Sequence, residues 1–232
     1  GGGSGNDEIH AISTLPSGSS YVCGNFYSPC IFDTIQLILP DTANAFIAKV
    51  DDLGTLIWVK YFPTPGQSTG TITDVAVAWD GGCFMTGSWT DSIRLDTTLL
   101  FKNGSTNTFF SRLDQNGTLL WIKHASGTWN YSGSVVSNNL GDVYFAGRYY
   151  DSLTIDSTTI VNTLIGEGSF IVKFDSTGQF RWLKNIQGSQ ISINEIAIDN
   201  EESVVITGRF SSISIVDTTQ LISNGVNDLF IA

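Results

Sequence analysis

The residues that most often carry out catalysis are few and scattered in this 232-residue chain. The two histidines, His10 and His124, lie far apart, and the sequence contains neither an H-E-x-x-H motif nor a G-x-S-x-G motif. Carboxylate pairs such as Asp51/Asp52 are common, but nothing in the sequence sets the separation between two carboxylates that a glycosidase requires. We therefore predict no catalytic residues, no metal site and no cofactor, with a carbohydrate-active enzyme as the alternative.

A recurring Asp-x-x-Gly sequence is the other candidate for chemistry. A calcium loop is one interpretation, but the D-x-D-x-D-G pattern that supplies calcium ligands is absent. In a turn, Asp accepts hydrogen bonds from the backbone that follows it, and glycine adopts a positive φ angle. We interpret the three copies as turns: Asp51/Gly54, Asp114/Gly117 and Asp175/Gly178.

These turns lie inside 16-residue blocks that align without a gap, such as "TFFSRLDQNGTLLWIK" at 108–123. The other copies are at 45–60 and 169–184. A second marker contains a glycine in the copies "YVCGNF", "FMTGSW", "YFAGRY" and "VITGRF". It is preceded by "NDEIHAIS", "ITDVAVAW", "SGSVVSNN" and "INEIAIDN" and followed by an Asp-Thr or Asp-Ser turn. The marker glycines, spaced 63, 60 and 61 residues apart, indicate a repeat architecture: Gly24, Gly87, Gly147 and Gly208.

Each repeat predicts four short strands, a to d, with a small hairpin between b and c. In the second repeat these strands are 73–78, 83–89, 109–114 and 119–123, rich in Val, Ile, Phe and Thr and bounded by turn residues. Helical periodicity is almost absent.

Strand d of each repeat is apolar on both faces around a tryptophan (Trp58, Trp121 or Trp182), which is typical of a strand packed on both sides. Four-stranded units that cover one another in this way describe a β-propeller. We predict an all-β propeller region over 1–232 with about four units of about 61 residues. The last unit lacks its final strand, so we expect a larger propeller, or a ring that another segment closes. The predicted units are 6–66, 67–127, 128–188 and 189–232.

The motifs "GGSGNDEI" at 2–9, "YVCGNF" and "AFIAKVDDLGTLIW" resemble the bacterial β-propeller repeat family, and the resemblance covers essentially the whole chain. It implies a secreted or cell-surface protein, often of Bacteroidetes-like bacteria, whose propeller serves for binding or display. Two departures are a weak strand a in the third unit and an extra-long a–b connection, "TLPSGSS", in the first.

The three cysteines, Cys23, Cys30 and Cys83, align with small or apolar strand positions of the other repeats. The odd count and the lack of clustered histidines argue against a zinc site or a full set of disulfides. We predict free core cysteines, with a Cys23–Cys30 disulfide as the alternative.

Two tryptophans fall outside the repeat pattern, Trp79 at an a–b turn and Trp129 in the predicted d–a loop "SGTWNYSG". Asn130 and Tyr131 follow Trp129, on the face that carries the Asp-Thr hairpins. Aromatic rings stack on sugars while amides hydrogen-bond to them, so we predict a ligand site at Trp129, Asn130 and Tyr131. A loop aromatic that covers the edge of a unit is the alternative.

Eight Asp-Ser/Thr sequences followed by a small or apolar residue resemble the O-glycosylation sequon of secreted Bacteroidetes proteins. Turn formation alone explains the recurring copies, so Thr42 and Ser92, which fall off the repeating turn, discriminate better. The candidate sites are Thr34, Thr42, Ser92, Thr97, Ser152, Ser157, Ser176 and Thr218.

Composition narrows the partners and the compartment. Twenty-two acidic against 11 basic side chains give a net charge of −11, which repels nucleic-acid phosphates. No apolar run is long enough for a transmembrane helix, so we expect no membrane insertion. Only 14% of residues are charged, which favours an extracellular or cell-surface location. We expect a non-catalytic module for adhesion, display, or binding of a glycan or protein, completed by further blades or a partner chain. A purely structural spacer is a further alternative.

Overall fold

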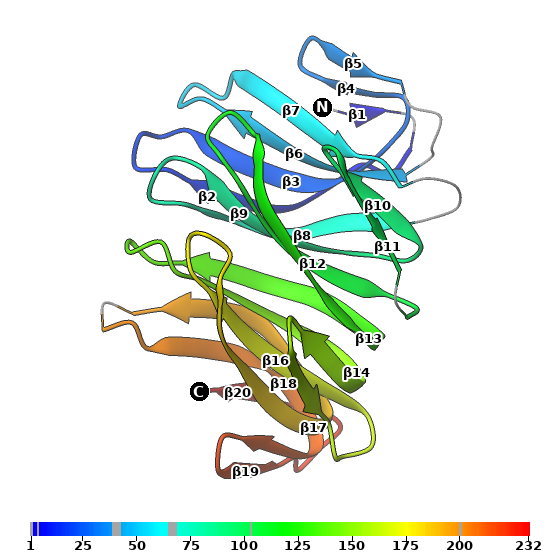
Figure 1. Cartoon of the computed structure of the whole chain (residues 1–232), viewed down its shortest axis with the longest axis vertical. Coiled ribbons are helices and arrows are strands. Elements are labelled where there is room, and N and C mark those ends of the chain that lie inside the picture. The colour runs from blue at the N-terminus through cyan, green and yellow to red at the C-terminus, as the bar shows by residue number, and fades with distance from the viewer. Residues whose placement is uncertain (1, 4, 39–42, 65–68, 103, 200) are drawn as a thin grey trace.

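The computed structural model of the chain describes residues 2–3, 5–38, 43–64, 69–102, 104–199 and 201–232. These segments form strands and turns and contain no helix, so the all-β prediction is confirmed. Accordingly, the described residues include no helix that could cross a membrane. Figure 1 shows the strands arranged in layers along the long axis, with the N-terminal sheet at one end and the C-terminal strands at the other.

The antiparallel sheets repeat one strand order. The first sheet has the order β2-β3-β6-β7, which corresponds to strands a, b, c and d of the first repeat. Its strands are β2 (Glu8–Thr14), β3 (Ser20–Tyr27), β6 (Ala43–Val50) and β7 (Leu56–Phe62). The second repeat pairs its strands in the same order: β8 (Gly70–Val77), β9 (Cys83–Trp89), β12 (Asn107–Leu113) and the start of β13 (Leu119–Ser137).

Two strands are long enough to serve two repeats each. β13 pairs with β12 as strand d of the second repeat and then with β14 as strand a of the third. β17 does the same between the third and fourth repeats, so these repeats join in one 11-stranded sheet. The remaining strands of these repeats are β14 (Val143–Ile155), β16 (Glu167–Phe174), β17 (Phe180–Ile198), β18 (Val204–Val216) and β20 (Asp228–Ile231).

The prediction of a loop around Trp129 is therefore wrong, because this segment is part of strand β13. Its backbone pairs with β14, opposing Trp129 to Tyr150 and Tyr131 to Arg148. Pairing satisfies peptide groups that a loop would leave to water, and the sequence gives no proline to prevent it.

A small hairpin follows strand b in every repeat, as predicted. Its turn is made by an aspartate at positive φ, which Asp tolerates better than most residues. The angles are 52° at Asp33, 50° at Asp96, 51° at Asp156 and 51° at Asp217. The hairpin strands are β4 (Cys30–Phe32) with β5 (Ile35–Leu37), β10 (Ser92–Leu95) with β11 (Thr98–Phe101), and the ends of β14 and β18 with β15 (Thr158–Val161) and β19 (Thr219–Ile222). β1 (Gly2–Gly3) extends the first hairpin by pairing with β4.

The Asp-x-x-Gly sequences are turns between strands c and d. Asp114 Oδ1 accepts hydrogen bonds from the backbone N–H groups of Asn116 (2.9 Å) and Thr118 (2.8 Å), and Gly117 has a φ angle of 80°. Asp51 and Asp175 make the same pair of bonds in their own turns. One carboxylate oxygen of each aspartate thus holds its own turn, as the turn interpretation predicts.

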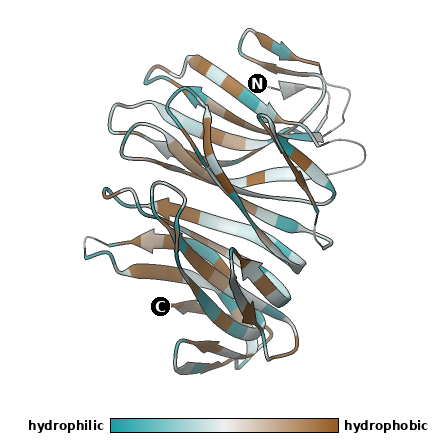
Figure 2. Cartoon of the chain, in the orientation of Figure 1, coloured by the Kyte–Doolittle hydropathy of each residue, from teal (hydrophilic) through white to brown (hydrophobic). Residues whose placement is uncertain are grey.

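The hydrophobic core is divided between neighbouring repeats. One cluster joins the first and second repeats, a second joins the second and third, and a third joins the third and fourth. Figure 2 shows hydrophobic and hydrophilic bands alternating along the strands that face one another. Trp58 and Trp121 bridge these layers, since each donates its indole N–H to the c–d turn of the next repeat, at Gln115 O (3.2 Å) and Ser176 O (3.0 Å).

The first repeat differs from the prediction in its strand a. In the first repeat a backbone hydrogen bond from Leu15 N to Ser19 O (2.8 Å) closes the a–b turn. The bond from Ala78 N to Gly82 O (2.8 Å) closes the a–b turn of the second repeat in the same way, so the two connections have the same length. The expected extra length came from aligning "NDEIHAIS" three residues out of register. Ile9, and not Asn6, corresponds to Ile72, because these isoleucines oppose the marker glycines of strand b.

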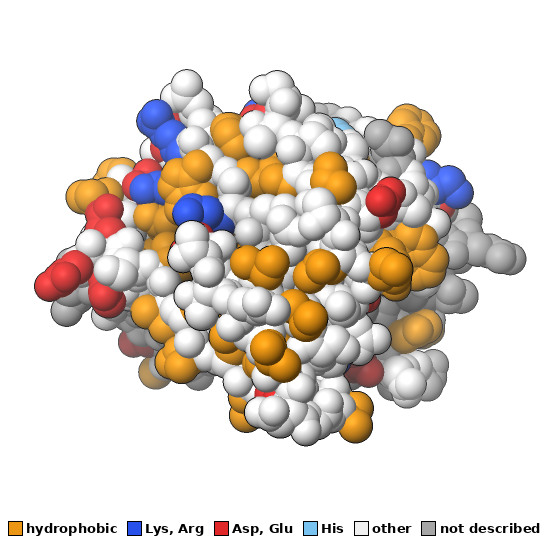
Figure 3. Space-filling model, turned by 90° about the horizontal axis from the view of Figure 1, so that it is seen from below, with side chains coloured by type: hydrophobic (Ala, Val, Ile, Leu, Met, Phe, Trp, Pro, Cys, Tyr) orange, Lys and Arg blue, Asp and Glu red, His pale blue; other side chains and the backbone are white. Residues whose placement is uncertain are grey.

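Apolar side chains lie at both ends of the layers, buried beside a cavity at one end and exposed at the other. In the first repeat, a smaller cluster of Phe26, Cys30, Phe46 and Ala48 adjoins a cavity of about 430 Å³ on the side away from the second repeat. At the other end, Leu229 and Ile231 of β20 are 85% and 75% exposed. Figure 3, a view from below, shows hydrophobic side chains over the middle of that face.

Candidate functional site

The glycine of each "YVCGNF"-type marker brings strands a and b unusually close. A methyl group on Gly147 would collide with the carbonyl oxygen of Tyr131 in strand a and come within 2.7 Å of the Phe170 ring in strand c. Gly24, Gly87 and Gly208 have the same kind of backbone neighbour. The glycine is thus a scaffold requirement, which explains its recurrence.

The residue after this glycine differs from repeat to repeat. It is paired across the ladder with a strand a residue that also differs. The four pairs are Glu8/Asn25, Thr71/Ser88, Tyr131/Arg148 and Ser192/Arg209. Two positions further out, Trp129 opposes Tyr150, and one backbone hydrogen bond joins Thr90 to Thr69. We call the four pairs, with these outer residues, the variable surface.

The variable surface is hollowed by two cavities that share Arg148. The larger, of about 510 Å³, is lined by hydroxyl and aromatic groups that include Thr71, Ser88, Thr90 and Tyr131. Ser132 lies in its wall, where its Oγ is 2.9 Å from both Ser88 Oγ and Thr73 Oγ1.

The smaller cavity, of about 300 Å³, contains most of the charge. It is lined by Arg148, Tyr150, Glu167, Gln190 and Arg209, together with Ser192 and Asn227. Arg148 is held by an ion pair with Glu167 (3.2 Å) and lies over the Tyr131 ring at 5.3 Å. Two guanidinium groups therefore face one carboxylate.

Of the three predicted ligand residues, two lie on the variable surface and one does not. Trp129 is 46% exposed, and its ring centroid is 6.4 Å from that of Tyr131. Asn130 is fully buried, because successive side chains of a strand point to opposite faces. Its amide nitrogen and oxygen have no hydrogen-bond partner among the described residues. Trp79, at the a–b turn, is 64% exposed.

A second group of polar residues lies where the first strands of the repeats converge. Ser134 Oγ is 2.8 Å from Asp74 Oδ2 and 2.7 Å from Glu195 Oε1, and His10 lines the same cavity of about 600 Å³. A hydroxyl has one hydrogen, so Ser134 bonds to both carboxyl groups only when one of them is protonated. Burial raises the pKa of Asp74 and the charge of Glu195 raises it further, against hydrogen bonds from Val135, Ser134 and Val75. The cavity thus holds one carboxyl group that is harder to ionise and one that is exposed.

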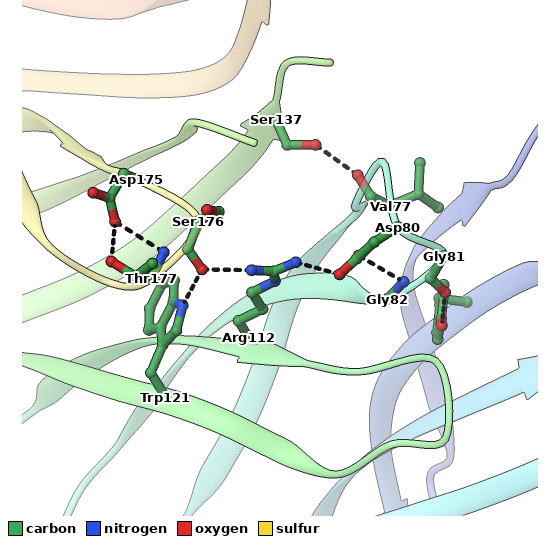
Figure 4. A network of polar contacts seen from close by, with 11 residues as sticks. Val77, Asp80, Gly81, Gly82, Arg112, Trp121, Ser137, Asp175, Ser176 and Thr177 are labelled. Atoms are coloured by element: carbon green, nitrogen blue, oxygen red, sulfur yellow. Dashed lines mark hydrogen bonds and ion pairs between the residues drawn. The ribbon is translucent and has the colours of Figure 1, made fainter. Parts of the chain in front are cut away.

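A third group, on the side of the c–d turns, is structural (Figure 4). The buried Arg112 forms a 2.5 Å ion pair with Asp80 and donates to the Ser176 carbonyl oxygen (2.5 Å), which Trp121 also reaches. Lys49 and Lys173 occupy the same position in their repeats and also contact turn residues. These cations satisfy turn carbonyls and carboxylates, so they are not available to a ligand.

The predicted O-glycosylation sites lie in different environments. Four of them follow the positive-φ aspartates of the hairpins and are exposed: Thr34, Thr97, Ser157 and Thr218. Ser152 and Ser176 are partly buried, and Ser92 is only 7% exposed, so an enzyme could not reach Ser92 in the folded chain. Thr42 lies outside the described residues. Of the two discriminating sites, one is thus inaccessible and the other is not described.

The cysteines are free and buried, as predicted, so the Cys23–Cys30 disulfide is not formed. Burial raises the pKa of Cys23 to about 12 and raises the pKa of Cys30 and Cys83 as well. Across the described ranges, no three His, Cys, Asp or Glu side chains are grouped as a metal site would need.

The chain has only weak similarity to known proteins. No protein-family model matches the chain. It is 23% identical over 208 residues to an uncharacterized WD repeat-containing protein, L264, of Acanthamoeba polyphaga mimivirus, covering 73% of this chain and 14% of that protein. The likeness agrees with a repeat, propeller-like fold. A crystal structure of a Bacteroides caccae protein of unknown function overlaps 97% of this chain and 61% of its own, with a TM-score of 0.47 and 10% identity. Membership of the bacterial β-propeller repeat family stays a prediction.

Sequence reasoning missed the two arginines of the variable surface. The signal was present, since Arg148 and Arg209 each follow a marker glycine, where the other repeats have Asn25 and Ser88. When repeats share their scaffold residues and differ at one surface position, that position is a candidate for ligand recognition.

Proposed function

We propose that this chain is part of a β-propeller that acts as a non-catalytic binding module of a secreted or cell-surface protein, with the variable surface as its saccharide-binding face. The observation that carries the proposal is the contrast within the repeat. Glycine, turn aspartates and interlayer tryptophans recur, whereas the residues that line the two cavities change from repeat to repeat. The WD-repeat likeness and the stacking of successive repeats support the propeller.

The chemistry of the surface supports a saccharide ligand. Trp129 and Tyr150, 46% and 45% exposed, offer ring faces for stacking, and Thr, Ser and Gln side chains beside them can exchange hydrogen bonds with sugar hydroxyls.

The test is a glycan array followed by calorimetry on the chain. Trp129→Ala and Tyr150→Ala should each weaken binding about tenfold, the value of a lost stacking contact of about 1.4 kcal/mol. Trp79→Ala removes an exposed tryptophan from the a–b turn side and should leave affinity unchanged. Failure of the folded wild-type chain to bind any saccharide would contradict the proposal and favour a structural spacer.

The Asp74–Ser134–Glu195 group favours one second candidate, a carbohydrate-active enzyme. A carboxyl group of raised pKa close to a second carboxyl group is the pairing that glycoside hydrolysis uses. Release of reducing sugar by the wild type, lost in both Asp74→Asn and Glu195→Gln, would support this function. Release that persists in both variants, or none from a panel of polysaccharides, would exclude it.

A further inference from the structure

We propose that Arg148 and Arg209 form the carboxylate-binding end of the variable surface, so that the ligand is a largely neutral oligosaccharide carrying a uronic-acid residue. The inference rests on the proposed function and names the class of its ligand. Its starting point is that arginine occupies the variable position in two neighbouring repeats, and that both side chains line one cavity of about 300 Å³.

The state of the other cations shows how unusual this cavity is. Of the 11 lysines and arginines, eight form ion pairs with carboxylates, and Lys49 bonds to turn carbonyls. Apart from Lys49, whose partners are carbonyl groups, only Arg94 and Arg209 make no ion pair with any described residue. Arg94 lies on a hairpin strand, whereas Arg209 lines a cavity. An uncompensated guanidinium in a chain of net charge −11 marks this cavity as the place for an anion.

Arg148 is already held in place for such a ligand. Glu167 and the Tyr131 ring fix its guanidinium, so little side-chain freedom is lost when a ligand binds. Glu167 also balances one of the two positive charges, which leaves a single positive charge in the cavity. A carboxylate suits this charge and matches the planar fork of arginine with two parallel hydrogen bonds.

The surroundings favour a sugar over an acidic peptide or a polyanion. Beyond Arg148, the larger cavity presents hydroxyl groups and Tyr131 with no second uncompensated cation, which suits neutral sugar rings. Glu8 lies at the far end of the variable surface, and the net charge repels a chain with a carboxylate on every residue. One acidic residue flanked by neutral sugars fits both cavities.

The experiment measures the affinity of the wild-type chain for a panel of uronic-acid-bearing oligosaccharides and for the same oligosaccharides after reduction of the carboxyl group. We expect binding to at least one acidic member, with at least tenfold weaker binding of its reduced counterpart. Arg209→Gln should lose about tenfold or more and make the acidic and reduced forms equivalent, whereas Arg209→Lys should lose less, since it keeps the charge but not the fork. Arg94→Gln removes the other unpaired arginine and is the matched control, expected to bind as the wild type does.

The outcomes separate this inference from the function on which it rests. Equal affinity for acidic and reduced oligosaccharides would overturn the carboxylate site and leave saccharide binding intact. Binding of an acidic peptide but of no saccharide, lost in Arg209→Gln, would overturn the sugar assignment. Unchanged acidic-ligand binding in Arg209→Gln would overturn the role of this cavity, and absence of all binding would overturn both proposals.

Discussion

Trp121 in strand d of the second repeat donates its indole N–H to the backbone carbonyl of Ser176, in the c–d turn of the third repeat, at 3.0 Å. Trp58 bonds to Gln115 in the same way one repeat earlier. In the first two 16-residue blocks the tryptophan thus ties its layer to the next by packing and by one directed bond.

Replacing this tryptophan should separate the two contributions. Trp121→Phe keeps a ring but loses the hydrogen bond and should lower the free energy of unfolding by about 1 kcal/mol. Trp121→Ala should lower it by about 3 kcal/mol, because it also leaves a cavity between layers. Urea denaturation followed by circular dichroism measures both values. Trp79→Ala, at an exposed position, is the control, and an equal loss there would contradict the interlayer role.

The marker glycine gives a second prediction. Gly147→Ala should destabilise the chain by about 3 kcal/mol or prevent folding, because the added methyl group would meet the Tyr131 backbone and the Phe170 ring. Gly225 has no atom within 4 Å of the position that a methyl group would take, so Gly225→Ala should change stability by less than about 0.5 kcal/mol. Thermal unfolding of the two variants side by side checks this, and similar melting temperatures would contradict it.

The buried ion pair between Arg112 and Asp80 gives a third prediction, about stability. Asp80→Asn removes the charge that compensates Arg112, whose side chain is only 9% exposed, and should cost about 2 to 3 kcal/mol. This is somewhat less than for a fully buried pair, since the Asp80 side chain is 33% exposed. Arg112→Met removes the buried charge itself and should cost less than Asp80→Asn. The reverse order in denaturant titrations would show that the hydrogen bond to Ser176 matters more than the charge.

The buried thiols give a fourth prediction, about reactivity. Burial raises the pKa of Cys23 from 9.0 to about 12, which lowers its thiolate fraction at pH 8 about a thousandfold. All three cysteines should therefore resist a thiol reagent in the native chain and react at once in urea. Rapid reaction of any cysteine in the folded state would contradict their place in the core.

The raised pKa values of Cys23 and Tyr149 give a fifth prediction, that the fold loses stability at alkaline pH. Burial raises the pKa of Cys23 and of Tyr149 to about 12, and in both cases the neutral form is the one the folded state favours. A pKa raised by folding stabilises the fold fully below the unfolded-state pKa, and this stabilisation is lost as the pH rises towards the folded-state pKa. The melting temperature should therefore fall between about pH 9 and 12. Cys23→Ser and Tyr149→Phe should each reduce the steepness of that fall, and an unaltered slope in both would contradict it.

Much of the architecture follows from local chemistry that can be read in the chain. Asp114 and Gly117 make their turn with bonds to residues at most four positions away, and the hairpin aspartates adopt positive φ by themselves. The strands, the turns and the repetition were predictable for this reason. There were two exceptions. The register of strand a of the first repeat depends on the marker glycine opposite it, and the segment around Trp129 becomes a strand by pairing with β14.

The candidate site depended on relations that cross repeats. Trp129 and Tyr131 could be picked out because they break the pattern, but the side to which Asn130 points required knowing that the segment is a strand. Ser134 bonds to both Asp74 and Glu195. These three residues belong to three successive repeats, each about 60 residues from the next. The convergence of Arg148 and Arg209 in one cavity joins two.

The sequence by itself therefore determined an all-β repeat chain with free cysteines and a net acidic surface, because turn chemistry and strand alternation act over a few residues. The tertiary structure alone decided which of the many polar side chains share a cavity and which cations stay uncompensated. Those properties depend on how neighbouring repeats stack. The spacing of residues within one repeat does not set the distance between side chains of two different repeats.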